Sequence, residues 1–357
     1  MGGGTVARMD EYGANGGPRF VSDVSELRVG LDLDGSLESL DNTMDDLADA
    51  LAKIDGVELF RFRSLNSSTS RNEVSIHLRR LWSPLWRRSL GPSLDRRLPH
   101  VDVVHVAGIL TPPTKSVPLI ISVDDLRPLR GESRAHQRIK QLRRAVEHGA
   151  VLVASSRSAS HEVQEVLELR RSEIVVVPPA VPLVAATQNG GDLVVNVTGV
   201  RKPFLELAPE LLKFTESVGA RLVAVTSSAV GQRIRSSGLP IRSLSRRDAR
   251  AAIGSARLVL HMSDGARFPS FAIASLSAGV PTLARSTSIN RELLSGAAAL
   301  VANDDEALDV LRDVWFNDAK RAIMIAAGHA RAVDFAPDTA AKAYARLYRN
   351  VVRGWNP

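Results

Sequence analysis

Two adjacent basic side chains in the second half of the chain have the chemistry to hold a phosphate group. Arg201 and Lys202 directly follow the apolar run LVVNVTGV at residues 193–200, which is typical of a buried parallel strand leading into a loop. Fixed cations near a helix N-terminus neutralise a diphosphate without a metal ion. The other interpretation is a solvated loop pair, because an Arg-Lys dipeptide is common.

A polar loop further along leads into a short helix. The loop SDGARFP at residues 263–269 follows another apolar run, and a helix is predicted to begin near Ser270 and Phe271. Backbone N–H groups at a helix N-terminus bind phosphates, and serine often caps a helix. We therefore predict a second phosphate-binding element here, with the acidic side chain of Asp264 in the same loop.

Carboxylates follow two apolar runs in the first half of the chain. Asp32 and Asp34 end one run, and Asp124 and Asp125 end another. The sequence GLDLDGSL resembles the first motif of haloacid dehalogenase-type phosphatases, which implies a phosphoryl-accepting Asp32, an acid/base Asp34 and Mg²⁺ held with Asp124 and Asp125. Only about ninety residues separate the two acidic pairs, and no Ser/Thr strand end and Lys fit between them. The phosphatase stands as an alternative.

Short apolar runs alternate with helical patterns along most of the chain, which predicts parallel sheets covered by helices on both faces. The runs lie at residues 27–33, 57–62, 101–106, 118–126, 150–155, 174–181, 193–200, 220–228, 240–244, 256–263 and 280–286. The polar stretch LVAATQNGGD, after the sixth run, is typical of a hinge. The fold class is therefore α/β with two doubly wound lobes.

The domain boundaries follow from this pattern. We predict a flexible tail, an N-terminal lobe, a hinge, a C-terminal lobe and a helix that crosses back to the N-terminal lobe, at residues 1–26, 27–184, 185–192, 193–337 and 338–357. In doubly wound sheets, ligands bind beyond the carboxyl ends of the strands. The cleft between the lobes is therefore where a site is expected.

The order of these features resembles that of family 4 retaining glycosyltransferases of the GT-B superfamily. Residues 242–301 resemble its donor-binding half, with Ser245 and Asp248 before a strand, then a short loop, a helix and Ala-Gly-Val-Pro. Residues 142–181 resemble the segment closing its N-terminal lobe, and VDVVHVAGILTPP and VPLIISVDDL resemble its acceptor-lobe strands. The resemblance covers roughly residues 27–353 and implies two Rossmann-like lobes facing across a cleft, with a nucleotide-sugar in the C-terminal lobe and an acceptor in the N-terminal lobe.

The resemblance also implies which residues act. The donor-binding residues would be Gly199, Arg201, Lys202, Leu244, Ser270 and Phe271. Asp264 would orient the transferred sugar, and Asp124 would touch the sugar or the acceptor. Transfer would proceed with retention of anomeric configuration, and neither a metal nor another cofactor would be required.

Three departures from the family pattern leave a second interpretation open. The family carries two glutamates in the donor loop and helix, the first contacting the sugar and the second the ribose, where this chain has Ala266 and Ala274. A histidine of the acceptor lobe is replaced by Asp124, and DGSLESLDN stands in place of a glycine-rich loop. Asp264 in a longer loop would substitute for the first glutamate. The alternative is a GT-B subunit that has lost catalysis and binds a partner enzyme or an acceptor.

Composition narrows the classes of function. The chain has 357 residues, 44% of them hydrophobic, and no cysteine, which excludes disulfides and thiolate chemistry. A net charge of +7 favours an anionic partner such as a nucleotide or an anionic lipid. No stacking platform for nucleic acid is visible, and the histidines lack a metal-ligand spacing. With neither a membrane-spanning run nor a secretory signal in view, a cytoplasmic protein is expected.

Residues 77–98 (HLRRLWSPLWRRSLGPSLDRRL) combine Trp82 and Trp86 with arginines. One interpretation is an interfacial helix that contacts the inner membrane face peripherally. The other, slightly favoured, is a helix whose Trp pair packs inward and which Pro84 interrupts. The acceptor is an unidentified glycan, lipid or protein, and a partner glycosyltransferase is a further expected contact.

Overall fold

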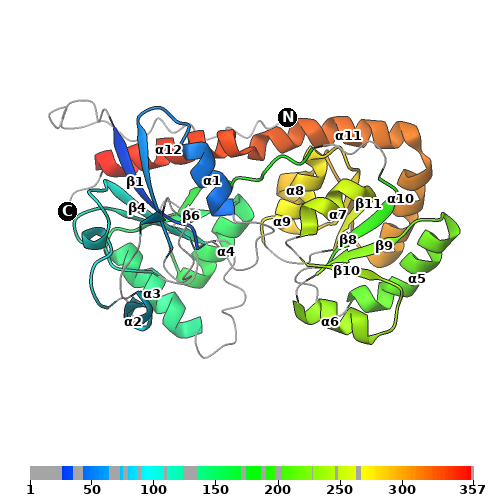
Figure 1. Cartoon of the computed structure of the whole chain (residues 1–357), viewed down its shortest axis with the longest axis horizontal. Helices are drawn as coiled ribbons and strands as arrows, with labels where there is room; N and C mark the ends of the chain where they lie inside the picture. The colour runs from blue at the N-terminus through cyan, green and yellow to red at the C-terminus, as the bar shows by residue number, and fades with distance from the viewer. Residues whose placement is uncertain are drawn as a thin grey trace.

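The computed structural model describes residues 26–34, 43–63, 73–74, 79–86, 90–107, 111–123, 135–169, 174–185, 190–197, 203–226, 228–245, 248–262 and 267–354. These residues form two α/β lobes that lie side by side, and two consecutive C-terminal helices, Asp318–Ala332 and Pro337–Gly354, run one along each lobe (Figure 1). The two-lobed α/β architecture predicted from the sequence is confirmed.

The N-terminal lobe is built on a seven-stranded sheet of order β3-β2-β1-β4-β5-β6-β7. Its strands are β1 (Leu27–Asp32), β2 (Val57–Phe62), β3 (Glu73–Val74), β4 (Val103–Ala107), β5 (Leu119–Val123), β6 (Val151–Ala154) and β7 (Ile174–Val176). Every strand pairing among the described residues of this sheet is parallel. The central strands are rich in Val, Ile and Leu because helices bury both faces of the sheet.

Two separate apolar cores cover the faces of this sheet. One face packs against α1 (Thr43–Leu51) and α12 (Pro337–Gly354). The other packs against α2 (Arg79–Trp86), α3 (Ala135–Glu147) and α4 (Arg157–Leu167), with the 3-10 turn η1 (Asp95–Arg97) beside them. The last helix of the chain therefore belongs to the core of the first lobe.

The C-terminal lobe repeats the design with a six-stranded parallel sheet of order β10-β9-β8-β11-β12-β13. Its strands are β8 (Asp192–Asn196), β9 (Leu222–Val225), β10 (Arg242–Leu244), β11 (Ala256–His261), β12 (Thr282–Arg285) and β13 (Ala299–Val301). One face packs against α5 (Pro203–Ser217), α6 (Ser228–Ser236) and α10 (Asp304–Phe316). The other packs against α7 (Ala249–Ser255), α8 (Ser270–Ser277) and α9 (Ser288–Leu294), and α11 (Asp318–Ala332) lies on α8.

The Ala-Gly-Val-Pro segment has a structural role at the end of α8. Gly279 has a φ of 71°, a left-handed conformation that suits glycine, and a Cβ there would lie 2.7 Å from His329 Nε2. Its N–H donates to Leu276 O, and Val280 N–H donates to Ser275 O. These bonds close the helix in a Schellman-type turn and send the chain into β12.

The chain passes between the lobes twice, and the two crossings touch. The first follows β7, and the second is the 3-10 turn η5 (Val333–Phe335) between α11 and α12. Val181 N–H donates to Phe335 O at 2.9 Å, and both residues pack in the core of the C-terminal lobe. The hinge predicted at residues 185–192 lies partly outside the described residues, and the domain boundaries stay predictions.

A buried polar contact fastens α12 to the sheet of the N-terminal lobe. His105 on β4 lies 2.7 Å from the Tyr348 hydroxyl through Nδ1 and 2.8 Å from Ser122 Oγ through Nε2. The ring of Tyr344 stacks on the imidazole at 5.3 Å between centroids. Burial lowers the pKa of His105 to about 3, so the ring stays neutral at pH 7.

Candidate functional site

Both sheets reverse their strand order beside their first strand. The reversal lies between β1 and β4 in the N-terminal lobe and between β8 and β11 in the C-terminal lobe. In doubly wound sheets, ligands bind beyond the carboxyl ends of the strands at this point. The candidate site is therefore built from the carboxyl edges of these four strands.

A buried polar pair joins the last residues of β8 and β11. Asn196 Nδ2 lies 3.1 Å from His261 Nδ1, and both side chains are buried. An amide nitrogen only donates, so His261 Nδ1 accepts and the proton of the neutral ring sits on Nε2. Burial lowers the pKa of His261 to about 4. The pair ties together the two strand ends from which the predicted donor-binding loops depart.

The His261 ring should make the folded lobe sensitive to acid. Its pKa is about 4 in the folded protein, against the ordinary histidine value of 6.5, so between these pH values the ring is protonated in the unfolded chain but neutral in the folded one. As pH falls from about 6.5 toward about 4, protonation of this ring in the unfolded chain should lower the free energy of unfolding by about 1.4 kcal/mol per pH unit. Urea unfolding at several pH values should show a shallower slope for His261→Gln. His100→Gln, which changes an exposed ring, should keep the wild-type slope, and an unchanged slope in His261→Gln would contradict this account.

The N-terminus of α8 lies beyond the end of β11 and offers backbone donors. The structure corrects one detail: Ser270 is the first residue of α8, and Pro269 occupies the cap position, where proline has no side-chain oxygen to accept a bond. The Ser270 N–H donates to Phe268 O at 2.9 Å. Among the described residues, the N–H groups of Phe271 and Ala272 have no acceptor. These two amides are therefore the donors that α8 presents to a ligand.

The structure also places three further residues of the predicted donor site. The side chain of Phe271 is 1% exposed and packs in the core, so only its backbone faces a ligand. Ala274, where the family resemblance places a ribose-contacting glutamate, is 5% exposed in the same core. Leu244 ends the edge strand β10 and is half-buried, and its carbonyl accepts from Thr226 N–H at 3.0 Å.

The remaining predicted site residues lie outside the described part of the chain. These are Asp124, Asp125, Gly199, Arg201, Lys202, Asp264 and Ala266. Their roles stay predictions. Their places in the chain are fixed by the described elements: residues 198–202 come after β8, residues 263–266 come after β11, and residues 124–134 come after β5.

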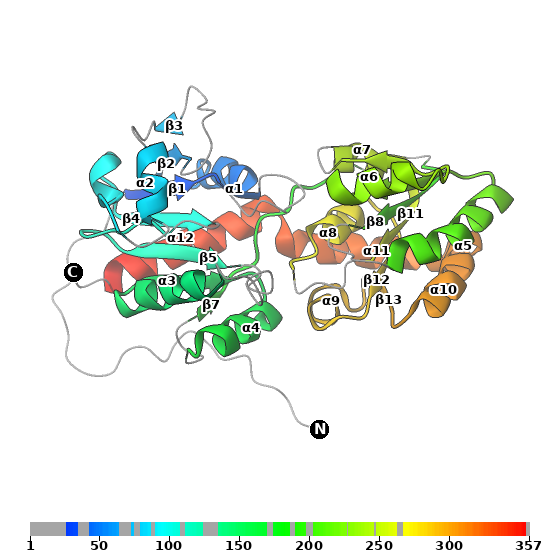
Figure 2. The same cartoon turned by 90° about the horizontal axis from the view of Figure 1, so that it is seen from below.

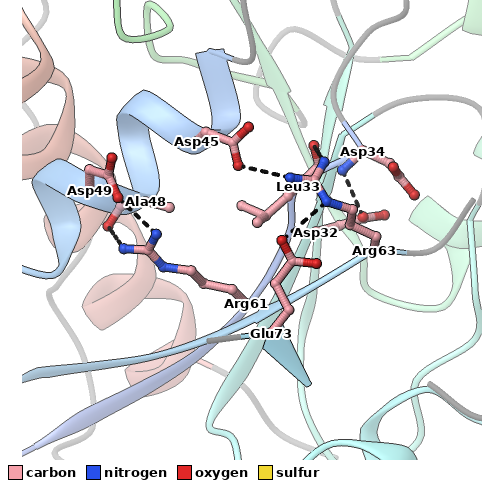
Figure 3. A network of polar contacts seen from close by, with 9 residues as sticks. All are labelled: Asp32, Leu33, Asp34, Asp45, Ala48, Asp49, Arg61, Arg63 and Glu73. Atoms are coloured by element: carbon pink, nitrogen blue, oxygen red, sulfur yellow. Dashed lines mark hydrogen bonds and ion pairs between the residues drawn. The ribbon is translucent and has the colours of Figure 1, made fainter. Parts of the chain in front are cut away.

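The corresponding edge of the N-terminal lobe carries a charge network that the sequence did not predict (Figure 3). The Arg63 guanidinium lies just past β2 and donates to Glu73 at 3.2 Å, to Asp45 at 3.2 Å and to the Leu33 carbonyl at 3.3 Å. Burial opposes its charge, but the carboxylates of Asp45 and Glu73 outweigh burial and raise the pKa of Arg63. The cation pairs with two of the carboxylates at the acidic edge next to β1.

Asp32 and Asp34 lie at this edge, at the end of β1. Both are buried, at 1% and 5% exposure, and the Asp34 N–H donates to Asp32 Oδ1 at 3.0 Å. Within the described residues, no group of three acidic or histidine side chains is arranged to hold a metal ion. The other predicted Mg²⁺ ligands of the phosphatase, Asp124 and Asp125, lie outside the described residues, so the described geometry does not test this alternative.

Helix α2 shows which way its tryptophans face. Trp86 is fully buried in the lobe core, with its indole N–H bonded to Pro92 O at 3.0 Å. Trp82 packs beside it, 6.0 Å between ring centroids, under the guanidinium of Arg97. The inward-packing interpretation is confirmed for this pair, whereas Pro84 lies inside α2, so the prediction that it interrupts the helix is wrong. Peripheral membrane contact stays a prediction.

None of the helices among the described residues is long and apolar enough to cross a membrane.

Comparison with known proteins identifies the architecture. No protein-family model matches the sequence, and no curated protein matches it by sequence. HepE of Anabaena, solved with UDP, is 14% identical over 91% of this chain and 100% of its own, with a TM-score of 0.61. Sucrose-phosphate synthase of Thermosynechococcus elongatus is 12% identical over 92% of this chain and 100% of its own, with a TM-score of 0.64.

TarM of S. aureus is 9% identical with a TM-score of 0.55; the match covers 69% of this chain, which spans about half (54%) of TarM. At these identities the matches show the fold alone. Together with the two sheet orders, they establish that the chain has the GT-B architecture, as predicted from its sequence.

Proposed function

We propose that this chain is a glycosyltransferase that moves a sugar from a nucleotide-sugar to an acceptor hydroxyl. The observation that carries the proposal is the GT-B fold, shared over nine-tenths of the chain with HepE, whose structures contain UDP, and UDP-glucose in another crystal. The donor would lie at the carboxyl edge of the C-terminal lobe, where β8 and β11 end beside the N-terminus of α8. The acceptor would lie at the facing edge of the N-terminal lobe.

Charge neutralisation would drive the reaction in this proposal. The bond from the sugar anomeric carbon to the diphosphate oxygen breaks and leaves its electron pair on that oxygen, the acceptor oxygen bonds to the carbon, and the acceptor's proton passes to the departing nucleoside diphosphate or to solvent. Arg201 and Lys202, with the amides of Phe271 and Ala272, would stabilise the negative charge that grows on the diphosphate. These groups would suffice without a metal ion, and the stereochemical outcome proposed from the family resemblance is retention.

The sugar and the nucleotide would be held by fewer carboxylates than the family resemblance implies. Asp264 would orient the sugar, Asp124 would touch the sugar or acceptor, and Leu244 would pack near the nucleotide. Ala274, which is buried, stands where the family resemblance implies a ribose-contacting glutamate. Losing that bond costs on the order of 1.5–3 kcal/mol, which weakens donor binding without abolishing it.

Calorimetry and a donor-hydrolysis assay together test the proposal. The purified chain should bind at least one of UDP-glucose, ADP-glucose and GDP-mannose and slowly release the sugar, equally well in EDTA and in Mg²⁺. Binding without turnover would indicate the degenerate subunit that binds a partner. If no nucleotide-sugar binds, and Mg²⁺-dependent release of phosphate from a generic ester disappears in Asp32→Asn, the phosphatase would replace this proposal.

A further inference from the structure

One carboxylate of the C-terminal lobe binds the N-terminus of a helix in the other lobe. Glu292 on α9 accepts from the N–H groups of Arg157 and Ser158, both at 2.8 Å, and from Ser158 Oγ at 2.7 Å. The Arg157 Nε lies 3.4 Å away. The Glu292 side chain is only 14% exposed, and these hydrogen bonds lower its pKa against the opposing effect of burial. The two helices lie next to each other at the junction of the lobes (Figure 2).

This carboxylate completes the capping of α4. A helix begins with N–H groups that have no partner within the helix. The Ser156 side chain accepts from Ala159 N–H, and the Ser156 carbonyl accepts from Ser160 N–H. The two remaining first-turn donors, at Arg157 and Ser158, are those that Glu292 satisfies. The first turn of α4 is therefore fully bonded only while the lobes stand in this arrangement.

The backbone of Glu292 and Leu293 is itself bonded to the segment in which the chain crosses between the lobes. Arg331 at the end of α11 donates to the carbonyls of Leu293 at 2.8 Å and Glu292 at 3.3 Å. The same guanidinium lies 4.9 Å from the Phe335 ring centroid and is bonded to Asp334 at 2.6 Å. Since Phe335 is also where the two chain crossings are hydrogen-bonded, Glu292 projects from a segment fixed to the crossing.

A second contact between the lobes is weaker. Arg250 on α7 lies 3.6 Å from Asp46 on α1, and the arginine side chain is 52% exposed. Solvent-exposed pairs of this kind contribute little to stability. A largely buried carboxylate that accepts two backbone N–H groups and a hydroxyl makes charge-assisted bonds, which are much stronger. The α4–α9 contact is thus the stronger of these two polar contacts between the lobes.

We propose that Glu292 is a positioning residue: by capping α4 across the junction, it holds the donor-binding edge of one lobe in register with the facing edge of the other. The proposed effect on the lobe arrangement rests on this contact, and only the expected effect on turnover rests on the proposed function. Glu292 acts through the backbone of α4 and α9 and does not touch the substrates. Its removal should open the lobes and slow transfer while leaving the donor edge intact.

Distance measurements between the lobes test this directly. The chain has no cysteine, so spin labels attach only where cysteines are introduced. Lys53→Cys and Lys213→Cys place labels on exposed positions of the N-terminal and C-terminal lobes. In Glu292→Ala, double electron–electron resonance should show a distribution of label distances that is broader and shifted to longer values. The population with the lobes arranged as in this structure should fall about tenfold or more relative to forms in which the lobes lie further apart. Glu292→Gln keeps one acceptor oxygen and should fall between.

Two matched variants separate positioning from helix capping. Glu306→Ala removes a carboxylate that caps α10 within its own lobe, where its Oε2 accepts from Ala302 N–H at 2.7 Å. Ser156→Ala removes the cap of α4 without touching the contact between the lobes. Neither should change the label distances. For turnover, Glu292→Ala should lower kcat about tenfold while donor affinity, measured by calorimetry, changes less than about twofold.

The label distances and the turnover measurement test the two proposals separately. If no nucleotide-sugar is turned over by the wild type but Glu292→Ala still lengthens the label distances, the proposed function fails and the positioning role stands. Label distances in Glu292→Ala identical to those of the wild type would overturn the positioning role, whatever the activity. A donor affinity that collapses along with kcat would assign Glu292 to the donor site and would equally overturn it.

Discussion

Replacing Arg201 and Lys202 together by alanine should abolish measurable nucleotide-sugar binding. Each side chain would make a charge-assisted bond to the diphosphate, which is worth about 1.5–3 kcal/mol. Losing both should cost about 3–6 kcal/mol, or about 100-fold to 10,000-fold in Kd. Calorimetry with the best-binding nucleotide-sugar measures the loss. The free nucleoside diphosphate should lose affinity in parallel, because the two cations are proposed to bind the diphosphate itself.

A second double variant controls for net charge. Arg312→Ala with Lys320→Ala removes two positive charges from α10 and α11, where each side chain has a carboxylate partner on the surface. This variant should bind nucleotide-sugar with the wild-type Kd. Full affinity in the Arg201/Lys202 variant would remove these residues from the site. Equal losses in both variants would reduce their role to general electrostatic attraction.

Tyr348→Ala should destabilise the protein by about 3–5 kcal/mol, the cost typical of deleting a large buried aromatic side chain. Tyr348 is fully buried in the core shared by α12, α1 and the N-terminal sheet. Its hydroxyl lies 2.7 Å from His105 Nδ1, and this pairing is lost as well. Because the chain enters α12 directly after its second crossing between the lobes, release of this helix should also loosen the connection between them. Urea unfolding followed by circular dichroism measures the change.

Two variants separate packing from hydrogen bonding in this contact. Tyr348→Phe keeps the ring and leaves His105 Nδ1 without its partner, so it should cost about 1–3 kcal/mol. Lys342→Ala changes an exposed residue of the same helix and should stay within about 0.5 kcal/mol of the wild type. If Tyr348→Ala were as stable as Lys342→Ala, α12 would not be an integral part of the N-terminal lobe.

The fold was predictable from the sequence because its strands are buried on both faces. The predicted run at residues 57–62 has the bounds of β2, the run at 193–200 begins one residue after the start of β8, and the run at 256–263 contains β11. Such runs alternating with helices leave few architectures other than doubly wound sheets. The local pattern of apolar residues was therefore sufficient to predict the fold.

The contacts that shape the site were not predictable in the same way, because they join residues far apart in the chain. Asn196 and His261 meet only after two strands pair, and Glu292 reaches helix α4, 134 and 135 positions earlier in the chain. A polar residue at the end of an apolar run was the one available signal for Asn196 and His261. Glu292 stands in an ordinary helical segment, and its sequence surroundings give no indication of a partner in the other lobe.

A crystal structure with a soaked nucleoside diphosphate tests the central claim most directly. We expect the diphosphate within hydrogen-bond distance of the Phe271 and Ala272 N–H groups, with Arg201 and Lys202 around it, beyond the ends of β8 and β11. A diphosphate bound instead at the Asp32 edge of the N-terminal lobe, or a C-terminal edge that stays empty at saturating ligand, would contradict the account.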